Sequence, residues 1–377
     1  MYLASAKSIF TNDMLSYYQW AREPGYALFL KFVLYFSNLD IVISVAQGTI
    51  FAFSALYLAK EMGLFKQTRV VTIFLLLSLP TTLGFIGDVL QQILMSSLVM
   101  CLAASGIGVL NSLHASSKSK NIKLLVFLIF CCISSLFTFI LLPVEFALCL
   151  YIFFQLEKSI LPSRKSLNLI AGFALSQLPL ISWWVFKFLK VGYGPVSTGS
   201  AWGWQGAVRA QYGDANFLAV VSGLLGIGED SHVPGRGIHE TWLYGLGNPN
   251  ENCGVIGGPE DFFNYIAGMV RLTCRNTEIY NHYQHYSELS FKFVTFIIVF
   301  GILIGIKSML QIRGSHTEKI VMISVFSLLG TYLIGGAGIS RYSFPVFAPV
   351  LIFLTLKVQD RVSKKGKMVN LRGNRVK

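Results

Sequence analysis

The strongest constraint on this chain is a series of apolar segments, each close to the length that crosses a lipid bilayer. A transmembrane helix needs about 20 predominantly apolar residues, because each residue advances the helix by only about 1.5 Å. Nine segments approach or meet this length: 39–59, 68–86, 90–113, 122–140, 141–156, 166–187, 290–307, 319–337 and 342–357. A further apolar stretch, 25–38, is too short to cross, and we expect it to form a helix that lies at the membrane interface.

Composition agrees with a membrane protein. Of the 377 residues, 54% are apolar and only 13% are charged, whereas a soluble domain carries roughly 25% charged residues. So little polar surface cannot cover two or three soluble globules, and this excludes a soluble enzyme. The predicted fold class is therefore all-α: one polytopic integral membrane protein with about nine transmembrane helices and a large external loop that contains short helices.

The net charge of +13 follows from basic residues that gather on one predicted face. Short cytoplasmic loops collect Lys and Arg because these residues resist translocation. The junctions 60–69, 118–123, 157–166 and 307–319 and the segment from Lys357 to Lys377 hold 20 of the 31 basic residues. With nine crossings, all of them fall on the same side. We predict that this side is cytoplasmic, in a bacterial inner membrane, and we expect no nucleic-acid partner.

The same topology divides the chain into five parts. The long segment between the sixth and seventh crossings holds nine of the 18 acidic residues and several tryptophans, which favours a folded external cap. The predicted parts are an external N-terminal segment (1–38), six crossings (39–187), the external loop domain (188–289), three crossings (290–357) and a basic cytoplasmic tail (358–377). Nine crossings that end in the cytoplasm begin outside it, so we also expect a further transmembrane helix upstream of residue 1.

Arg341 is the first candidate for a binding residue. It follows a glycine-rich stretch at the predicted external mouth between the last two crossings, and Tyr342 comes next. The planar fork of donors of an arginine suits a phosphate, and a phosphate carried on a lipid would arrive at this depth. The sequence equally allows an interfacial arginine that snorkels beside an interfacial Tyr342.

Two carboxylates precede the interfacial helix on the predicted external face. Asp13 and Glu23 lie among aromatic residues, with Arg22 and Tyr26 beside Glu23. A carboxylate there could accept a proton from an attacking hydroxyl, or it could hold a divalent cation, the one cofactor that the residues suggest. The alternative is a solvated loop in which Arg22 and Glu23 form a local ion pair.

Lys187 lies at the external end of the sixth crossing. It departs from the pattern in which basic residues gather on the predicted cytoplasmic side. An anionic partner would explain it, and either a lipid-linked phosphate or an ordinary phospholipid headgroup would serve. Metal binding by protein ligands has less support, because His239-Glu240 and His282-x-x-His285 match no common zinc spacing. We predict no metal site.

Three stretches resemble motifs of the GT-C superfamily of membrane glycosyltransferases, the relatives of protein mannosyltransferases and of the aminoarabinose lipid A transferase. The run REPGYALFL from Arg22 to Leu30 resembles the segment that follows the first external loop of that family. The run from Leu178 to Ser197 resembles the central stretch that leads into the large external region. RYSFP, from Arg341 to Pro345, resembles the closing "RY-x-x-P" motif.

The resemblance implies an inverting transfer of a sugar from a polyprenyl-phosphate donor to a lipid, glycan or protein acceptor outside the cytoplasm. Asp13 occupies the region of the family's catalytic Asp, and Glu23 matches the acid just before the proline. Arg341 matches the arginine of the closing motif, and Lys187 stands where the family commonly has Arg. The chain departs from the pattern in lacking the first helix, in having Ala27 for the second proline, and in having no Glu beside Asp13.

Two other functions fit parts of the sequence. A polymerase of O-antigen or exopolysaccharide has a similar length and many crossings around one large external loop, and would extend a lipid-linked repeat. A non-catalytic transporter or lipid-binding membrane protein is the third reading. Transporters usually show internal repeats and ionisable residues at mid-membrane, whereas here no repeat is evident and Asp40, Asp88 and Glu145 fall at the ends of predicted crossings.

Overall fold

The computed structural model describes residues 24–36, 40–87, 92–112, 117–156, 164–191, 277–311, 315–334 and 344–373. Every regular element within these ranges is a helix, which confirms the all-α class. In chain order they are α2 (Gly25–Phe36), α3 (Asp40–Glu61), α4 (Lys66–Ser78), α5 (Pro80–Gly87), α6 (Gln92–Asn111), α7 (Ser117–Phe137), the 3₁₀ turn η3 (Phe139–Leu141), α8 (Leu142–Leu156), α9 (Arg164–Ser176), α10 (Leu178–Val191), α15 (Thr277–Leu310), α16 (His316–Ile334) and α17 (Phe344–Gly373).

Five of the described segments are long and apolar enough to cross a membrane: Val42–Glu61, Gln92–Asn111, Phe139–Leu156, Ser166–Phe186 and Phe293–Leu310. They coincide with five of the nine predicted crossings and confirm a polytopic membrane fold. The predicted crossing 122–140 and the predicted interfacial stretch correspond to shorter apolar helices, Asn121–Phe137 and Gly25–Phe36. The other predicted crossings, 68–86, 319–337 and 342–357, correspond to α4 with α5, to α16 and to α17.

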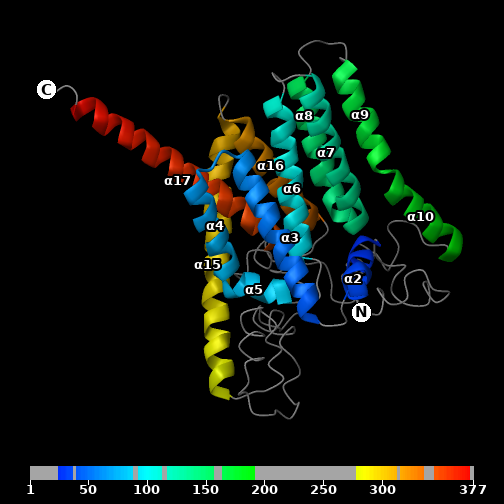
Figure 1. Cartoon of the computed structure of the whole chain (residues 1–377), viewed down its shortest axis with the longest axis horizontal. Coiled ribbons are helices and arrows are strands. Elements are labelled where there is room, and N and C mark those ends of the chain that lie inside the picture. Colours follow the sequence, from blue (N-terminus) through cyan, green and yellow to red (C-terminus); the bar gives the residue numbers. More distant parts are fainter. Residues whose placement is uncertain are drawn as a thin grey trace.

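The bundle is built around α6. Its apolar residues cover the whole circumference, and a helix that is apolar all round is usually buried in a protein core. The crossing segment of α6 is 100% buried, against 17% for the segment formed by α9 and α10. Helices α3, α7, α8, α16 and α17 contact α6 directly, while α9 and α10 lie at the edge of the bundle (Figure 1).

Two predicted crossings are broken rather than continuous. Leu79 separates α4 from α5 in an extended conformation (φ −73°, ψ 128°), because the ring of Pro80 disfavours helical geometry at the residue before it. Gln177 forms a turn between α9 and α10, and Pro179 has no N–H to continue the ladder of helical hydrogen bonds. A pattern of hydrophobicity alone does not show these breaks.

Other helix boundaries also differ from the sequence-based expectation. The turn between the fourth and fifth crossings lies at Thr138, which has φ −167° and ψ 130° and whose side chain accepts a hydrogen bond from the N–H of Ile140. Pro143 falls instead in the first turn of α8. Helix α15 begins at Thr277, within the predicted external loop, and α17 continues to Gly373 through most of the predicted tail. Figure 1 shows the C-terminal part of α17 projecting from the bundle.

Candidate functional site

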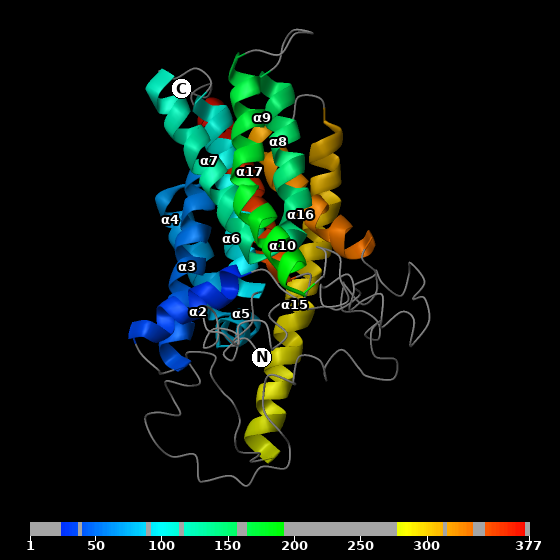
Figure 2. The same cartoon turned by 90° about the vertical axis from the view of Figure 1, so that its right-hand side faces the viewer.

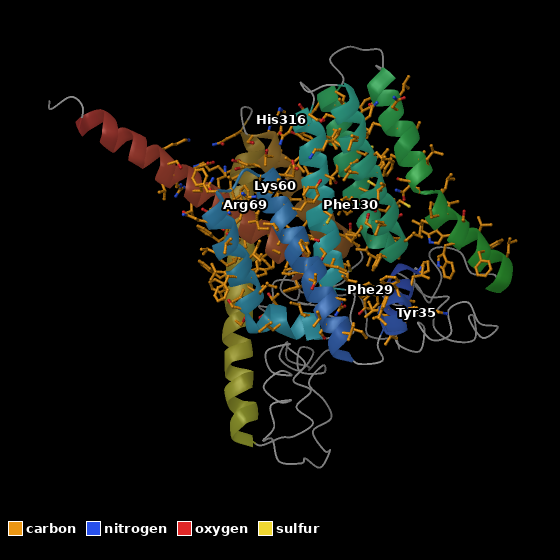
Figure 3. All side chains as sticks on the ribbon, viewed as in Figure 1. Phe29, Tyr35, Lys60, Arg69, Phe130 and His316 are labelled. Carbon is orange, nitrogen blue, oxygen red and sulfur yellow. The ribbon has the colours of Figure 1, made fainter. Side chains whose placement is uncertain are left out.

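Ion pairs define one end of the bundle. Lys123 Nζ in α7 lies 3.0 Å from Glu61 Oε1 in α3, and Lys357 in α17 pairs with Glu318 in α16. The same end carries Gln359, whose Oε1 accepts a hydrogen bond from the N–H of Phe65 at 2.8 Å. Lys60, Arg69 and His316 all lie toward this end (Figure 3). The structure thus brings together residues of the junctions 60–69, 118–123 and 307–319 and the start of the tail, which the sequence placed on one side.

The opposite end contains a buried hydrogen-bonded link through Tyr26. Its side chain is 1% exposed, and its hydroxyl donates to Gln47 Oε1 at 3.1 Å. Gln47 Nε2 in turn donates to the carbonyl of Ile86 at 2.9 Å. The link joins α2, α3 and α5, and the ring of Tyr26 stacks on Phe29 with centroids 6.0 Å apart. Tyr26 therefore helps to fix α2, and its expected contact with a substrate stays a prediction.

Gly25 sets how closely α2 approaches the C-terminal end of α7. A Cβ atom at this position would lie 2.7 Å from the carbonyl oxygen of Leu136 and 2.7 Å from a ring carbon of Phe137. Only glycine fits such a contact with backbone. Helix α2 begins one residue after Pro24, so this contact also fixes the point where the chain carrying Glu23 joins the bundle.

We expect Gly25→Ala to destabilise the protein, because the carbonyl of Leu136 belongs to the backbone and cannot rotate away. Overpacking of this kind typically costs about 1–3 kcal/mol, which should appear as a lower melting temperature of the detergent-solubilised protein. Gly330→Ala in α16 is the matched control, since a Cβ there meets nothing within 4 Å. Equal melting temperatures for the two variants would contradict the packing of α2 on α7.

Several buried polar side chains lie around the same end. The hydroxyls of Thr81 in α5 and Ser290 in α15 are 2.7 Å apart. Among the described residues, Thr82 Oγ1, Gln92 Oε1 and Ser96 Oγ are buried and have no hydrogen-bond partner. Gln92 and Ser96 are four residues apart on α6 and share one of its faces. Polar atoms left unpaired in apolar surroundings are costly, so this end of the bundle has an unusually polar interior.

The predicted site residues relate to this end as follows. Asp13, Arg22, Glu23, Arg341 and Tyr342 lie outside the described residues. Lys187 belongs to α10, whose backbone is described and contacts α7 and α9. Among the described residues, no three His, Cys, Asp or Glu side chains gather as metal ligands.

A second polar cluster, around Glu145, was not recognised in the sequence. The carboxylate is 0% exposed and lies in the first turn of α8, near the start of the apolar segment Phe139–Leu156. Ser134 Oγ in α7 donates to Oε1 at 2.6 Å, and Gln177 Nε2 donates to Oε2 at 2.8 Å. The cluster ties α7 and α8 to the break between α9 and α10. An acidic residue within an apolar span is the signal that could have identified it.

We expect Glu145→Leu to destabilise the protein at the break between α9 and α10, because Gln177 Nε2 would keep only its 3.2 Å hydrogen bond to Ser176 Oγ. A buried donor that loses its acceptor costs about 1–3 kcal/mol, and thermal unfolding of the purified protein should measure the loss. The double variant Glu145→Leu/Gln177→Leu removes both partners and should recover part of it. If the double variant is as unstable as the sum of the two single ones, the proposed coupling is wrong.

The chain was compared with known proteins and solved structures. The crystal structure of ArnT from Cupriavidus metallidurans in the apo state matches with a TM-score of 0.42 and 10% sequence identity, over 94% of this chain and 71% of that one. No family model matches the chain, and no curated protein matches it. A similarity this distant transfers no residue role from one chain to the other.

Proposed function

We propose that this protein is a membrane glycosyltransferase that moves a sugar from a polyprenyl-phosphate donor to an acceptor on the extracytoplasmic side. One observation carries the proposal. The described helices next to the first and last motif segments, α2 with its Tyr26 link and α16 with Tyr332 near Met95, both reach the end of the bundle opposite the ion pairs. A site assembled from Asp13, Glu23 and Arg341 would then lie away from the basic face.

The same end of the bundle has a polar interior. Thr82, Gln92 and Ser96 carry two hydroxyls and an amide oxygen that are buried and lack partners among the described residues.

The chemistry is a displacement at the anomeric carbon. The bond from that carbon to the phosphate oxygen of the donor breaks, and a bond to the acceptor oxygen forms on the opposite face, which inverts the configuration. Asp13 takes the proton from the acceptor hydroxyl. We assign to Arg341, together with Lys187 and Tyr342, the stabilisation of the negative charge that develops on the departing lipid phosphate. The acceptor is a lipid, glycan or protein.

The direct test is transfer by the purified protein in vesicles with a radiolabelled polyprenyl-phosphate sugar and extracted envelope acceptors. We expect label to move to an acceptor and polyprenyl phosphate to be released in equal amount. Mass spectrometry of surface glycans and lipids in a deletion strain identifies the product. Loss of one sugar residue supports the transferase, whereas loss of long chains would indicate a polymerase. Solute uptake by the same vesicles without transfer would instead favour a transporter.

A further inference from the structure

An apolar groove lies between α8 and α9, on the outer side of the bundle. Its volume is about 270 Å³, and it is lined by Phe146, Cys149, Leu150, Phe153, Ile170 and Phe173. We call it the α8–α9 groove. Figure 2 shows the two helices side by side, and they are also in direct contact. The described residues that line the groove are all apolar or weakly polar, so water is a poor occupant.

The position of α9 is set by its contact with α7. A Cβ atom at Gly172 would lie 2.4 Å from Leu128 Cδ1, so glycine lets α9 approach α7 closely at this point. Phe173, the next residue, turns to α8 and forms part of the groove wall. Helix α9 thus contacts α7 through Gly172 and borders the groove through Phe173.

The two ends of the groove differ chemically. One end stops at the Glu145 cluster, because Glu145 precedes Phe146 and Gln177 lies one turn beyond Phe173. The other end leads toward the start of α9, whose first two residues are Arg164 and Lys165. Ile170 is six residues from Arg164, about 9 Å along a helix. The first turn of α9 therefore carries two positive charges.

We propose that the α8–α9 groove binds an acyl chain of an anionic glycerophospholipid from the predicted cytoplasmic leaflet, with the headgroup at the start of α9. The surrounding surface is apolar, since Phe146 is 59% exposed and Phe154 and Leu167 are also exposed. Hydrocarbon is therefore the medium around the groove. Basic residues on the cytoplasmic side of transmembrane helices attract anionic headgroups, which selects the lipid class. The proposal does not depend on the proposed transfer function.

The test uses the full-length protein in nanodiscs that contain equal amounts of phosphatidylglycerol and phosphatidylcholine. After mild extraction, native mass spectrometry counts the lipids retained by each protein. Wild type should retain phosphatidylglycerol in preference. Ile170→Trp fills the groove and should reduce that retention at least about fivefold. Leu167→Trp, on the same helix and 53% exposed but outside the groove, is the matched control and should behave as wild type.

A second variant keeps the proposal testable if Ile170→Trp fails to fold. Arg164→Gln/Lys165→Gln changes only the first turn of α9 and should abolish the preference for phosphatidylglycerol over phosphatidylcholine. Equal retention by Ile170→Trp and Leu167→Trp would overturn the site. Three other results would overturn the choice of occupant: no headgroup preference in wild type, preferential retention of added polyprenyl phosphate, or a dimer whose formation excludes lipid.

Discussion

Replacing Arg341 with alanine should lower the rate of sugar transfer at least about a hundredfold, the usual effect of removing one group that stabilises charge in a transition state. The negative charge on the lipid phosphate grows as the bond to the anomeric carbon breaks, and a guanidinium would offset it with two parallel hydrogen bonds. The measurement is transfer of label from the polyprenyl-phosphate sugar at saturating acceptor. Arg341→Lys keeps the positive charge but loses the paired N–H donors of the guanidinium, so we expect a rate between those of wild type and Arg341→Ala.

Arg361→Ala is the matched control for Arg341. Arg361 lies on α17, is exposed and stands beyond Lys357, at the ion-pair end of the bundle. Its loss should leave transfer unchanged. Membrane levels and melting temperatures of both variants should equal those of wild type, so that a loss of rate reports chemistry rather than folding. Full activity of Arg341→Ala would remove the proposed phosphate contact.

Asp13→Asn should lower the turnover number by about 10²–10⁴-fold, the contribution expected of a general base. The amide cannot accept the acceptor's proton, although it keeps the size of the carboxylate. Donor binding should change little, because the phosphate is held by other residues. Single-turnover transfer with preloaded donor separates these two effects.

Glu23→Gln tests whether the base has been assigned to the right carboxylate. Both acids precede α2, and the contact of Gly25 with α7 fixes the helix just after Glu23. If Asp13→Asn is active and Glu23→Gln is not, Glu23 is the base. Asp360→Asn, an exposed acid near the ion-pair end of α17, should have no effect in the same assay.

The helical fold followed from the sequence because its causes are local. A run of about 20 apolar residues forms a spanning helix wherever it occurs, since its backbone must satisfy its own hydrogen bonds in lipid. The crossings 39–59, 90–113 and 141–156 accordingly agree with α3, α6 and α8 to within a few residues. The broken crossings were missed because hydrophobicity does not distinguish one long helix from two short ones. Pro80 and Pro179 are the residues in the sequence that indicate the two breaks.

For the candidate site, the sequence predicted which residues contribute and on which side of the membrane they lie, but it did not predict their contacts. Tyr26 was chosen for its place in a motif, yet its described contacts are with Gln47, 21 residues away, and its ring neighbour Phe29. Glu145 was placed near a span end, which agrees with its position in the first turn of α8, but its hydrogen bonds were missed because its partners, Ser134 and Gln177, are 11 and 32 residues away. No local pattern encodes such pairs.

The sequence by itself determined that this chain is an all-helical membrane protein, and it grouped the basic junctions on one side, because both properties depend on residues close together in the chain. Only the tertiary structure decided which buried polar groups have a hydrogen-bond partner and which have none among the described residues. It placed Thr82 and Ser96 unpaired at one end, linked Glu61 to Lys123 at the other, and opened an apolar groove between α8 and α9. These features arise where separate helices pack, and the distance and angle between two helices depend on every side chain in their contact.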